Sequence, residues 1–332
     1  MYTLKRVATL TVVLALGTLG LTACSSDEPV DDASDTPTVD VASRLAGMNR
    51  KAEVDPETAT VRLPADYVVQ ETEEEGEVIS AAHDAAAAEC AREELGIPWV
   101  ATEPAELLPT DEMWSDYGPW TKSVAEKFAF VEPQSDRKLI FNGYVEKPEG
   151  YVGIEDAPGP NDHISASQLE EIREACVDKP ELLRFDAFEL WEYGPGQEAL
   201  NDEVDTRQQD PKMQALLEEL RVCYVENGIE FDENLAWVGF AADAAPASEK
   251  PNEEHITEEQ IQLALKTVEC KDQINFTQRV ADIIAERQVP IIEEYADDLF
   301  TIRAKWDNAA AEAKEYIASH PELFEPVSSN KK

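Results

Sequence analysis

The chain has 332 residues, of which 43% are hydrophobic, and its 70 acidic and 28 basic side chains give a formal net charge of −42. This charge excludes nucleic acid as a partner, because nucleic-acid binding requires Lys and Arg side chains that neutralise phosphates. The acidic residues are spread along the chain and no run has the D-x-D-x-D-G spacing of a calcium loop, so we interpret them as a solubilising surface, with cation binding as the alternative.

Residues 1–23 have the organisation of a secretory signal peptide. Lys5 and Arg6 precede a stretch from Val7 to Ser26 that contains no charged residue and becomes rich in small residues near its end. A basic start, an apolar middle and a small-residue end are typical of such signals. An uncleaved transmembrane helix is the alternative, because about 20 apolar residues can span a bilayer.

The sequence LTAC, which ends at Cys24, resembles the lipobox of bacterial lipoproteins. The resemblance implies cleavage between Ala23 and Cys24, a diacylglycerol thioether on Cys24, and acylation of the new amino terminus by a fatty acid such as palmitate. Two or more acyl chains hold a protein stably at a bilayer, whereas one holds it only marginally. We therefore expect an extracytoplasmic protein anchored to the cell membrane, with the lipid bilayer as the partner of acylated Cys24.

Residues 24–43 are expected to form a disordered acidic tether. They contain six acidic residues, two prolines and no basic residue, and such a segment cannot bury enough apolar surface to fold. The extracytoplasmic domain is then expected over residues 44–320, followed by a flexible tail over residues 321–332.

Four cysteines follow Cys24, and they are Cys90, Cys176, Cys223 and Cys270. An even number of cysteines in an exported chain predicts a disulfide framework. No two of them lie within four residues of each other, as metal-ligand pairs do, so we expect neither a metal nor another cofactor. Four cysteines allow three connectivities, and their positions alone do not choose among these.

Taken in chain order, the remaining patterns predict a mainly α protein. We expect a helical bundle with long C-terminal helices and a small aromatic-rich segment of α+β or irregular structure at residues 97–160. The first predicted elements are a short strand in 58–64, an alanine-rich helix over 76–96 and a strand over 138–146. Two further helices are expected: one is capped by Ser165 or Ser167 and closes at Pro180, and the other is capped by Asp210, has Pro211 at its first position and ends at Gly228. A helical stretch over 257–319 follows, interrupted only at Pro290.

Beyond Pro290 the apolar residues repeat with alternating steps of four and three. They are Tyr295, Leu299, Ile302, Trp306, Ala309, Ala313 and Tyr316. This is a heptad pattern, which can mark an oligomerisation helix or a helix that packs against other helices of the same chain. Because the pattern covers only three heptads and ends in alanines, we expect close antiparallel packing within the chain.

Two segments of the chain resemble each other around their cysteines. In CAREELGI, which begins at Cys90, and in CYVENGIEF, which begins at Cys223, the end of a helix carries a cysteine shortly before a Gly-Ile pair. Each segment is followed by a helix with another cysteine. The pattern suggests a degenerate repeat over residues 76–180 and 210–320. In such a repeat the simplest pairing joins the two cysteines of each half: Cys90–Cys176 and Cys223–Cys270.

At these residues the chain resembles a group of exported lipoproteins of actinobacterial type. The shared pattern is a lipobox, two helices that end in C-x-x-x-x-G, a Tyr-Gly pair between them, and a helix that contains A-x-x-x-x-C-K. Here Cys90 precedes Gly96 by six residues, one more than the pattern requires. The resemblance implies an exported, disulfide-bonded and mostly helical protein, and the group has no established activity.

The aromatic-rich segment is the candidate ligand surface. Its main residues are Trp99, Trp114, Tyr117 and Trp120, with Trp191 and Tyr193 further along the chain. Aromatic faces beside carboxylates suit sugars, peptides or cations. The alternative is that these rings form the hydrophobic core of a region that is poor in Leu and Ile.

Function is predicted only as a class. The chain has no H-E-x-x-H, G-x-S-x-G, P-loop or Rossmann pattern, so we name no catalytic residue. We expect a membrane-anchored lipoprotein that binds a cell-wall component or an envelope protein without catalysis. The alternatives are a solute-binding receptor of a transporter and, with less support, a cell-wall hydrolase.

Overall fold

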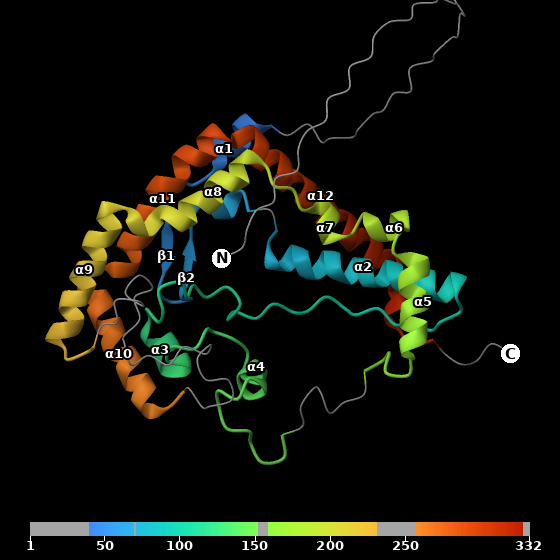
Figure 1. Cartoon of the computed structure of the whole chain (residues 1–332), viewed down its shortest axis with the longest axis horizontal. Coiled ribbons are helices and arrows are strands. Elements are labelled where there is room, and N and C mark those ends of the chain that lie inside the picture. The colour runs from blue at the N-terminus through green and yellow to red at the C-terminus, as the bar shows by residue number, and fades with distance from the viewer. Residues whose placement is uncertain (1–39, 70, 152–158, 231–255, 328–332) are drawn as a thin grey trace, which may run out of the picture. The chain divides into compact units, whose positions relative to one another are not determined.

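Helices dominate the computed structural model, which describes residues 40–69, 71–151, 159–230 and 256–327 (Figure 1). The helices are α1 (Val41–Gly47), α2 (Glu73–Glu94), α3 (Lys122–Phe128), α4 (Asp136–Phe141), α5 (Ala166–Cys176), α6 (Pro180–Leu183), α7 (Ala187–Leu190), α8 (Pro195–Thr206), α9 (Pro211–Glu226), α10 (Glu258–Gln273), α11 (Phe276–Glu294) and α12 (Ala296–Ser319). Short 3₁₀ helices are η1 (Pro64–Tyr67), η3 (Arg207–Gln209) and η5 (Pro321–Phe324). The predicted mainly α fold is confirmed.

In the described part of the chain, the only sheet is a small antiparallel hairpin. Its strands are β1 (Glu53–Asp55) and β2 (Thr60–Arg62), and Val54 pairs with Val61 at its centre. Strand β2 lies inside the predicted segment 58–64. Among the described residues, none of the helices has the length and apolar character needed to cross a membrane. Ala23 and Cys24 lie outside the described residues.

Helices α2 and α12 form the centre of one hydrophobic cluster. The alanine-rich face of α2 packs against Trp306, Ala309 and Ala313 of α12, all of which are buried. The heptad residues of α12 therefore pack within the chain, as expected, but the two helices run in the same direction and not antiparallel. Arg303 near the start of α12 pairs with Glu75 at the start of α2, and Tyr316 further along donates a hydrogen bond to Glu89.

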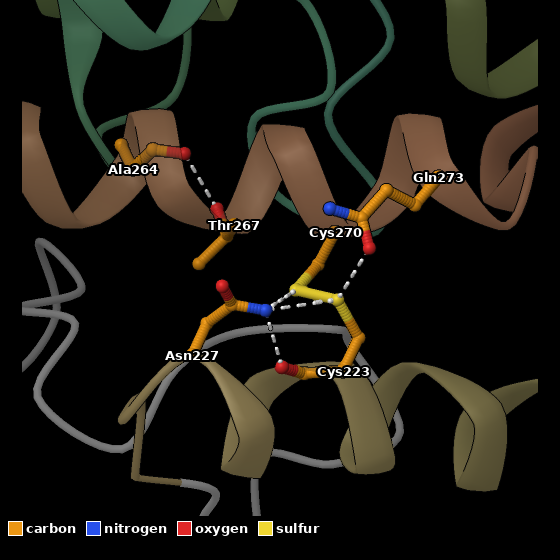
Figure 2. The surroundings of a disulfide bond; sticks show 6 residues. All are labelled: Cys223, Asn227, Ala264, Thr267, Cys270 and Gln273. Carbon is orange, nitrogen blue, oxygen red and sulfur yellow. Dashed lines mark hydrogen bonds between the residues drawn. A yellow bond between two sulfur atoms is a disulfide. The ribbon is translucent and has the colours of Figure 1, made fainter.

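A second cluster joins α9, α10 and α11 around the Cys223–Cys270 bridge. Asn227, which ends α9, donates from Nδ2 to the carbonyl of Cys223 at 2.9 Å and lies 3.5 Å from both sulfur atoms (Figure 2). The amide oxygen of Gln273 lies 3.5 Å from Cys223 Sγ on the other side. The bridge is thus enclosed by the polar ends of both helices that it joins.

The other bridge joins Cys90 on α2 to Cys176 on α5. The structure therefore contains both pairs expected from the internal repeat, which are separated by 86 and 47 residues. Both cysteine-bearing segments end at a glycine with a left-handed backbone, Gly96 at φ 67° and Gly228 at φ 68°. After them, the amide of Ile97 bonds back to residue 91 and the amide of Ile229 to residue 224. The extra residue before Gly96 is accommodated by this longer hydrogen-bonded ring.

Two predicted secondary structures were wrong. The segment 138–146 is not a strand, because Ser135 accepts a hydrogen bond from the amide of residue 138 and caps α4. The helical stretch 257–319 breaks at Asn275, which has a left-handed backbone with φ 51°, and again at Tyr295. Asparagine tolerates this conformation because its side chain is short and polar. Pro290 lies inside α11.

The predicted domain boundaries also need correction at both ends. Helix α1 begins at Val41, inside the predicted tether, because Asp40 caps it and Arg44 pairs with Asp307 of α12 at 2.8 Å. The predicted tail contains η5, where Leu323 is buried against α2. Arg92 fixes η5 by donating hydrogen bonds to three backbone carbonyl groups, which lie in η5 and directly after it. The described residues between 40 and 327 belong to one compact unit.

Candidate functional site

Three of the four predicted ligand residues lie together, two of them buried and Trp114 partly buried. Trp114 lies 5.5 Å from Tyr117 and 6.4 Å from Trp120 between ring centroids. Tyr117 and Trp120 are each only 5% exposed, and Trp120 donates its indole hydrogen to the carbonyl of Trp114 at 2.9 Å. Most of the surface of Tyr117 and Trp120 is therefore packed within the chain, as the alternative of a core region describes, and the ligand surface stays a prediction.

Trp99 belongs to a different part of the fold. It packs against the α2–α12 cluster, and its indole nitrogen donates to Asp84 of α2 at 2.9 Å. Its carbonyl accepts a hydrogen bond from Arg92. Trp99 therefore helps to fix the segment that leaves α2, and the four predicted rings do not form a common surface.

Lys271 is a buried lysine next to the aromatic loop that the sequence analysis did not single out. Its ammonium group is fully buried and donates to the carbonyls of Tyr117 and Pro119, the second at 2.8 Å. Burial lowers the pKa of Lys271 to about 7. The sequence contained a signal for this position, because Ala264, Thr267 and Lys271 lie on one buried face of α10. Lys271 connects the aromatic loop to α10.

A surface depression of about 450 Å³ lies beside Lys271. It is lined by β1, the start of α3 and the junction between α10 and α11, including Trp120, Asp272 and Asn275. Burial raises the pKa of Asp272. Among the described residues, no group of three His, Cys, Asp or Glu side chains is placed to hold a metal ion. The depression is therefore lined by aromatic side chains and by single polar groups that do not form a metal site.

The burial of Lys271 makes a prediction about pH. Its folded-state pKa lies below the unfolded value of about 10.4, so the folded state binds fewer protons between about pH 7 and 10, and stability rises with pH there. We expect the free energy of unfolding of the wild type, relative to Lys271→Met, to rise by up to about 1.4 kcal/mol per pH unit. Urea unfolding at several pH values measures this difference, and a constant difference would contradict the lowered pKa.

The exposed aromatic residues lie elsewhere, on α7 and the segment after it. Phe188 is 90% exposed, Tyr193 is 72% exposed and Trp191 is 42% exposed. We call these three residues the aromatic patch. Trp191 and Tyr193 were noted in the sequence as secondary members of the ligand region, whereas Phe188 was missed. Large apolar groups that gather on a surface often mark an interaction site.

The aromatic patch is fixed to the core through Trp191. The Trp191 ring meets the fully buried Trp306 of α12 edge to face, with 6.1 Å between centroids, and Tyr193 lies 6.0 Å from Trp191. Glu192, which separates Trp191 and Tyr193 in the sequence, pairs with Lys305. The rings of Trp191 and Tyr193 are therefore held in position before any partner binds, which lowers the entropy cost of binding.

The chain leaves the aromatic patch through a tight contact with α12. The amide of Gly196 donates to Asp298 Oδ2 at 2.8 Å. A Cβ atom at Gly196 would lie 2.7 Å from Leu299 Cγ and 2.9 Å from Tyr295 Cβ, closer than such atoms can approach. Glycine is therefore required where α8 starts. This contact fixes the second end of the segment that carries the aromatic patch.

No protein-family model, curated protein or solved structure matches the chain. The site must therefore be interpreted from its own geometry. The buried rings and Lys271 form a structural centre beside a shallow depression, whereas the aromatic patch offers exposed rings on a fixed support. Of the two, the aromatic patch has the properties of a binding surface.

Proposed function

We propose that the protein is an exported lipoprotein, anchored by acylated Cys24 to the extracytoplasmic face of the cell membrane, and that its helical domain binds a partner without catalysis. The observation that carries the binding function is the aromatic patch. Exposed Trp and Tyr rings held by a rigid support are the residues that contribute most to binding energy at interfaces. Exposed apolar groups that lie together often mark an interaction site, whereas a single exposed ring does not.

The two disulfides support the proposed location. Structural disulfides persist in oxidising compartments and are rare in the cytosol. The LTAC sequence at Cys24 supports the lipid anchor, because lipidation of that cysteine requires export. Both features point to the same side of the membrane.

The alternatives from the sequence receive less support. Solute-binding receptors are typically built from two similar lobes around a cleft, whereas the described residues between 40 and 327 belong to one compact unit. The hydrolase requires two carboxylates that converge in a pocket at a separation of about 5–10 Å. The depression beside Lys271 contains one carboxylate, that of Asp272, and does not meet this requirement, whereas a smaller pocket of about 310 Å³ is lined by Glu73, Asp111 and Glu132.

The lipid anchor is tested by Cys24→Ser. We expect the wild type to incorporate radioactive palmitate and to remain in the membrane fraction, and the variant to incorporate none. Ser25→Ala is the matched control, because it changes the neighbouring side chain and leaves the thiol in place. A wild type without label, or a variant that stays in the membrane fraction unprocessed and as tightly as the wild type, would contradict the anchor.

The binding function is tested by crosslinking in the native envelope, followed by mass spectrometry. The variant Phe188→Ser/Tyr193→Ser removes two rings that are mostly in water, so the fold should persist. Phe141→Ser is the control, because Phe141 is 70% exposed on α4, outside the aromatic patch. We expect the wild type and the control to recover the same partner and the patch variant to lose it. Recovery of identical molecules from all three would refute the proposed function.

A further inference from the structure

The surroundings of the aromatic patch are acidic. Between residues 181 and 198 the chain has five acidic residues and one basic residue: Glu181, Asp186, Glu189, Glu192 and Glu198 against Arg184. Glu189 is exposed on α7, next to Phe188. The aromatic patch therefore combines apolar rings with an excess of negative charge.

The basic side chains of this region are already engaged. The Arg184 guanidinium lies 4.4 Å from the ring centroid of Phe185 and 5.0 Å from that of Tyr316. Lys305 pairs with Glu192. Because this stretch has five acidic residues and one basic residue and Glu189 is exposed, a partner with positive charge would gain ion pairs at the rim.

We propose that the aromatic patch binds a basic segment of a partner polypeptide, whose Arg or Lys side chains lie over the rings of Trp191 and Tyr193 and reach the surrounding carboxylates. This inference rests on the proposed binding function and names its partner class. Arginine and lysine suit the surface because their apolar stems pack on aromatic rings while their charged ends meet acids.

Charge also disfavours two other occupants. A second copy of this chain would bring two strongly acidic molecules together, each with a formal net charge of −42, and like charges across an interface are costly. A neutral glycan could stack on the rings but would leave the carboxylates unpaired. A basic polypeptide alone uses both the rings and the acids.

The test uses the full-length lipidated protein in detergent and a fluorescein-labelled peptide in which arginine and leucine alternate. A second peptide has glutamine in place of arginine and therefore lacks the positive charge. We expect the wild type to bind the first peptide at least tenfold more tightly than the patch variant Phe188→Ser/Tyr193→Ser does, and Phe141→Ser to match the wild type. Glu189→Gln should weaken binding several-fold and reduce its dependence on salt.

Equal affinity of the wild type and the patch variant for the first peptide would overturn the inference, because general charge attraction would then explain the binding. Equal affinity of the wild type for both peptides would overturn it as well. An oligomer of N-acetylglucosamine that binds the wild type and not the patch variant, in place of the peptide, would overturn the inference and leave the proposed function standing. A dimer in sedimentation equilibrium that the patch variant abolishes would do the same.

Discussion

Replacing both cysteines of either disulfide by serine should lower the free energy of unfolding by at least about 4–5 kcal/mol, which is the expected effect of losing the closed loop. The bridges close loops with sequence separations of 86 and 47 residues, and a closed loop stabilises the folded state mainly by restricting the unfolded chain. The longer loop should contribute slightly more, because the entropy of closure grows only with the logarithm of loop length. Urea unfolding followed by the helical circular-dichroism signal measures both values.

The two bridges should contribute independently. Cys90 and Cys176 lie in the α2–α12 cluster, whereas Cys223 and Cys270 lie in the α9–α10–α11 cluster. Distant sites without shared contacts usually have additive effects, so the quadruple variant should lose about 8–10 kcal/mol, which exceeds the stability of many domains. We expect it to be largely unfolded at room temperature.

Alanine pairs are the matched control for the disulfide variants. Cys176 and Cys270 are almost fully buried, so serine adds the cost of burying a hydroxyl group, about 1–3 kcal/mol where it finds no partner. The alanine variants should therefore be slightly more stable than the serine variants. All measurements use a Cys24→Ser background, which prevents exchange with that thiol. A loss below about 1 kcal/mol in both alanine pairs would show that these bridges do not restrict the unfolded chain as expected.

Local chemistry explains why the helix starts could be predicted. Ser165 and Asp210 cap α5 and α9, and Pro211 occupies the first position of α9, all as the sequence indicated. Such signals depend on a few neighbouring residues and are therefore readable from sequence. The disulfide pairing was also accessible, because each half of the internal repeat contains one complete pair.

Tertiary contacts decided the features that the sequence did not reveal. Tyr117 is buried because its ring packs against Phe276 of α11, 5.9 Å away between centroids, while Lys271 of α10 donates a hydrogen bond to its carbonyl. Phe188 is exposed because α7 is short and buries no residue. Aromatic residues have similar local patterns in both settings, so composition alone could not separate core rings from surface rings. The relative direction of α2 and α12 is likewise a tertiary feature, because a long stretch of chain connects the two helices and local patterns do not fix how they align.

Glu203→Gln should produce the other large loss of stability. The carboxylate of Glu203 is almost fully buried, and its oxygens accept hydrogen bonds from Arg207 at 2.8 Å and from Arg287 at 3.0 Å. These contacts join α8 to η3 and α11. Glutamine has nearly the same shape but removes the negative charge that both guanidinium groups share. Breaking a buried ion pair by removing one partner typically costs about 3–5 kcal/mol, because the remaining charge is left buried without compensation.

The guanidinium group of Arg207 loses more charge compensation through this substitution than that of Arg287 does. Its side chain is nearly buried, and its Nε atom has no hydrogen-bond partner, so Glu203 supplies most of its compensation. Asp210 remains paired with Arg287 and can partly compensate that residue. We therefore expect the loss to lie near the lower end of the range, about 3 kcal/mol, measured by urea unfolding at neutral pH.

Asp205→Asn on the same helix is the control, because Asp205 is exposed and its removal should change stability by less than about 0.5 kcal/mol. The variant Glu203→Gln/Arg207→Met separates charge from packing. It removes the uncompensated guanidinium and keeps an apolar side chain of similar length, so it should recover part of the lost stability. Equal losses in Glu203→Gln and Asp205→Asn would mean that the buried carboxylate does not hold these helices together.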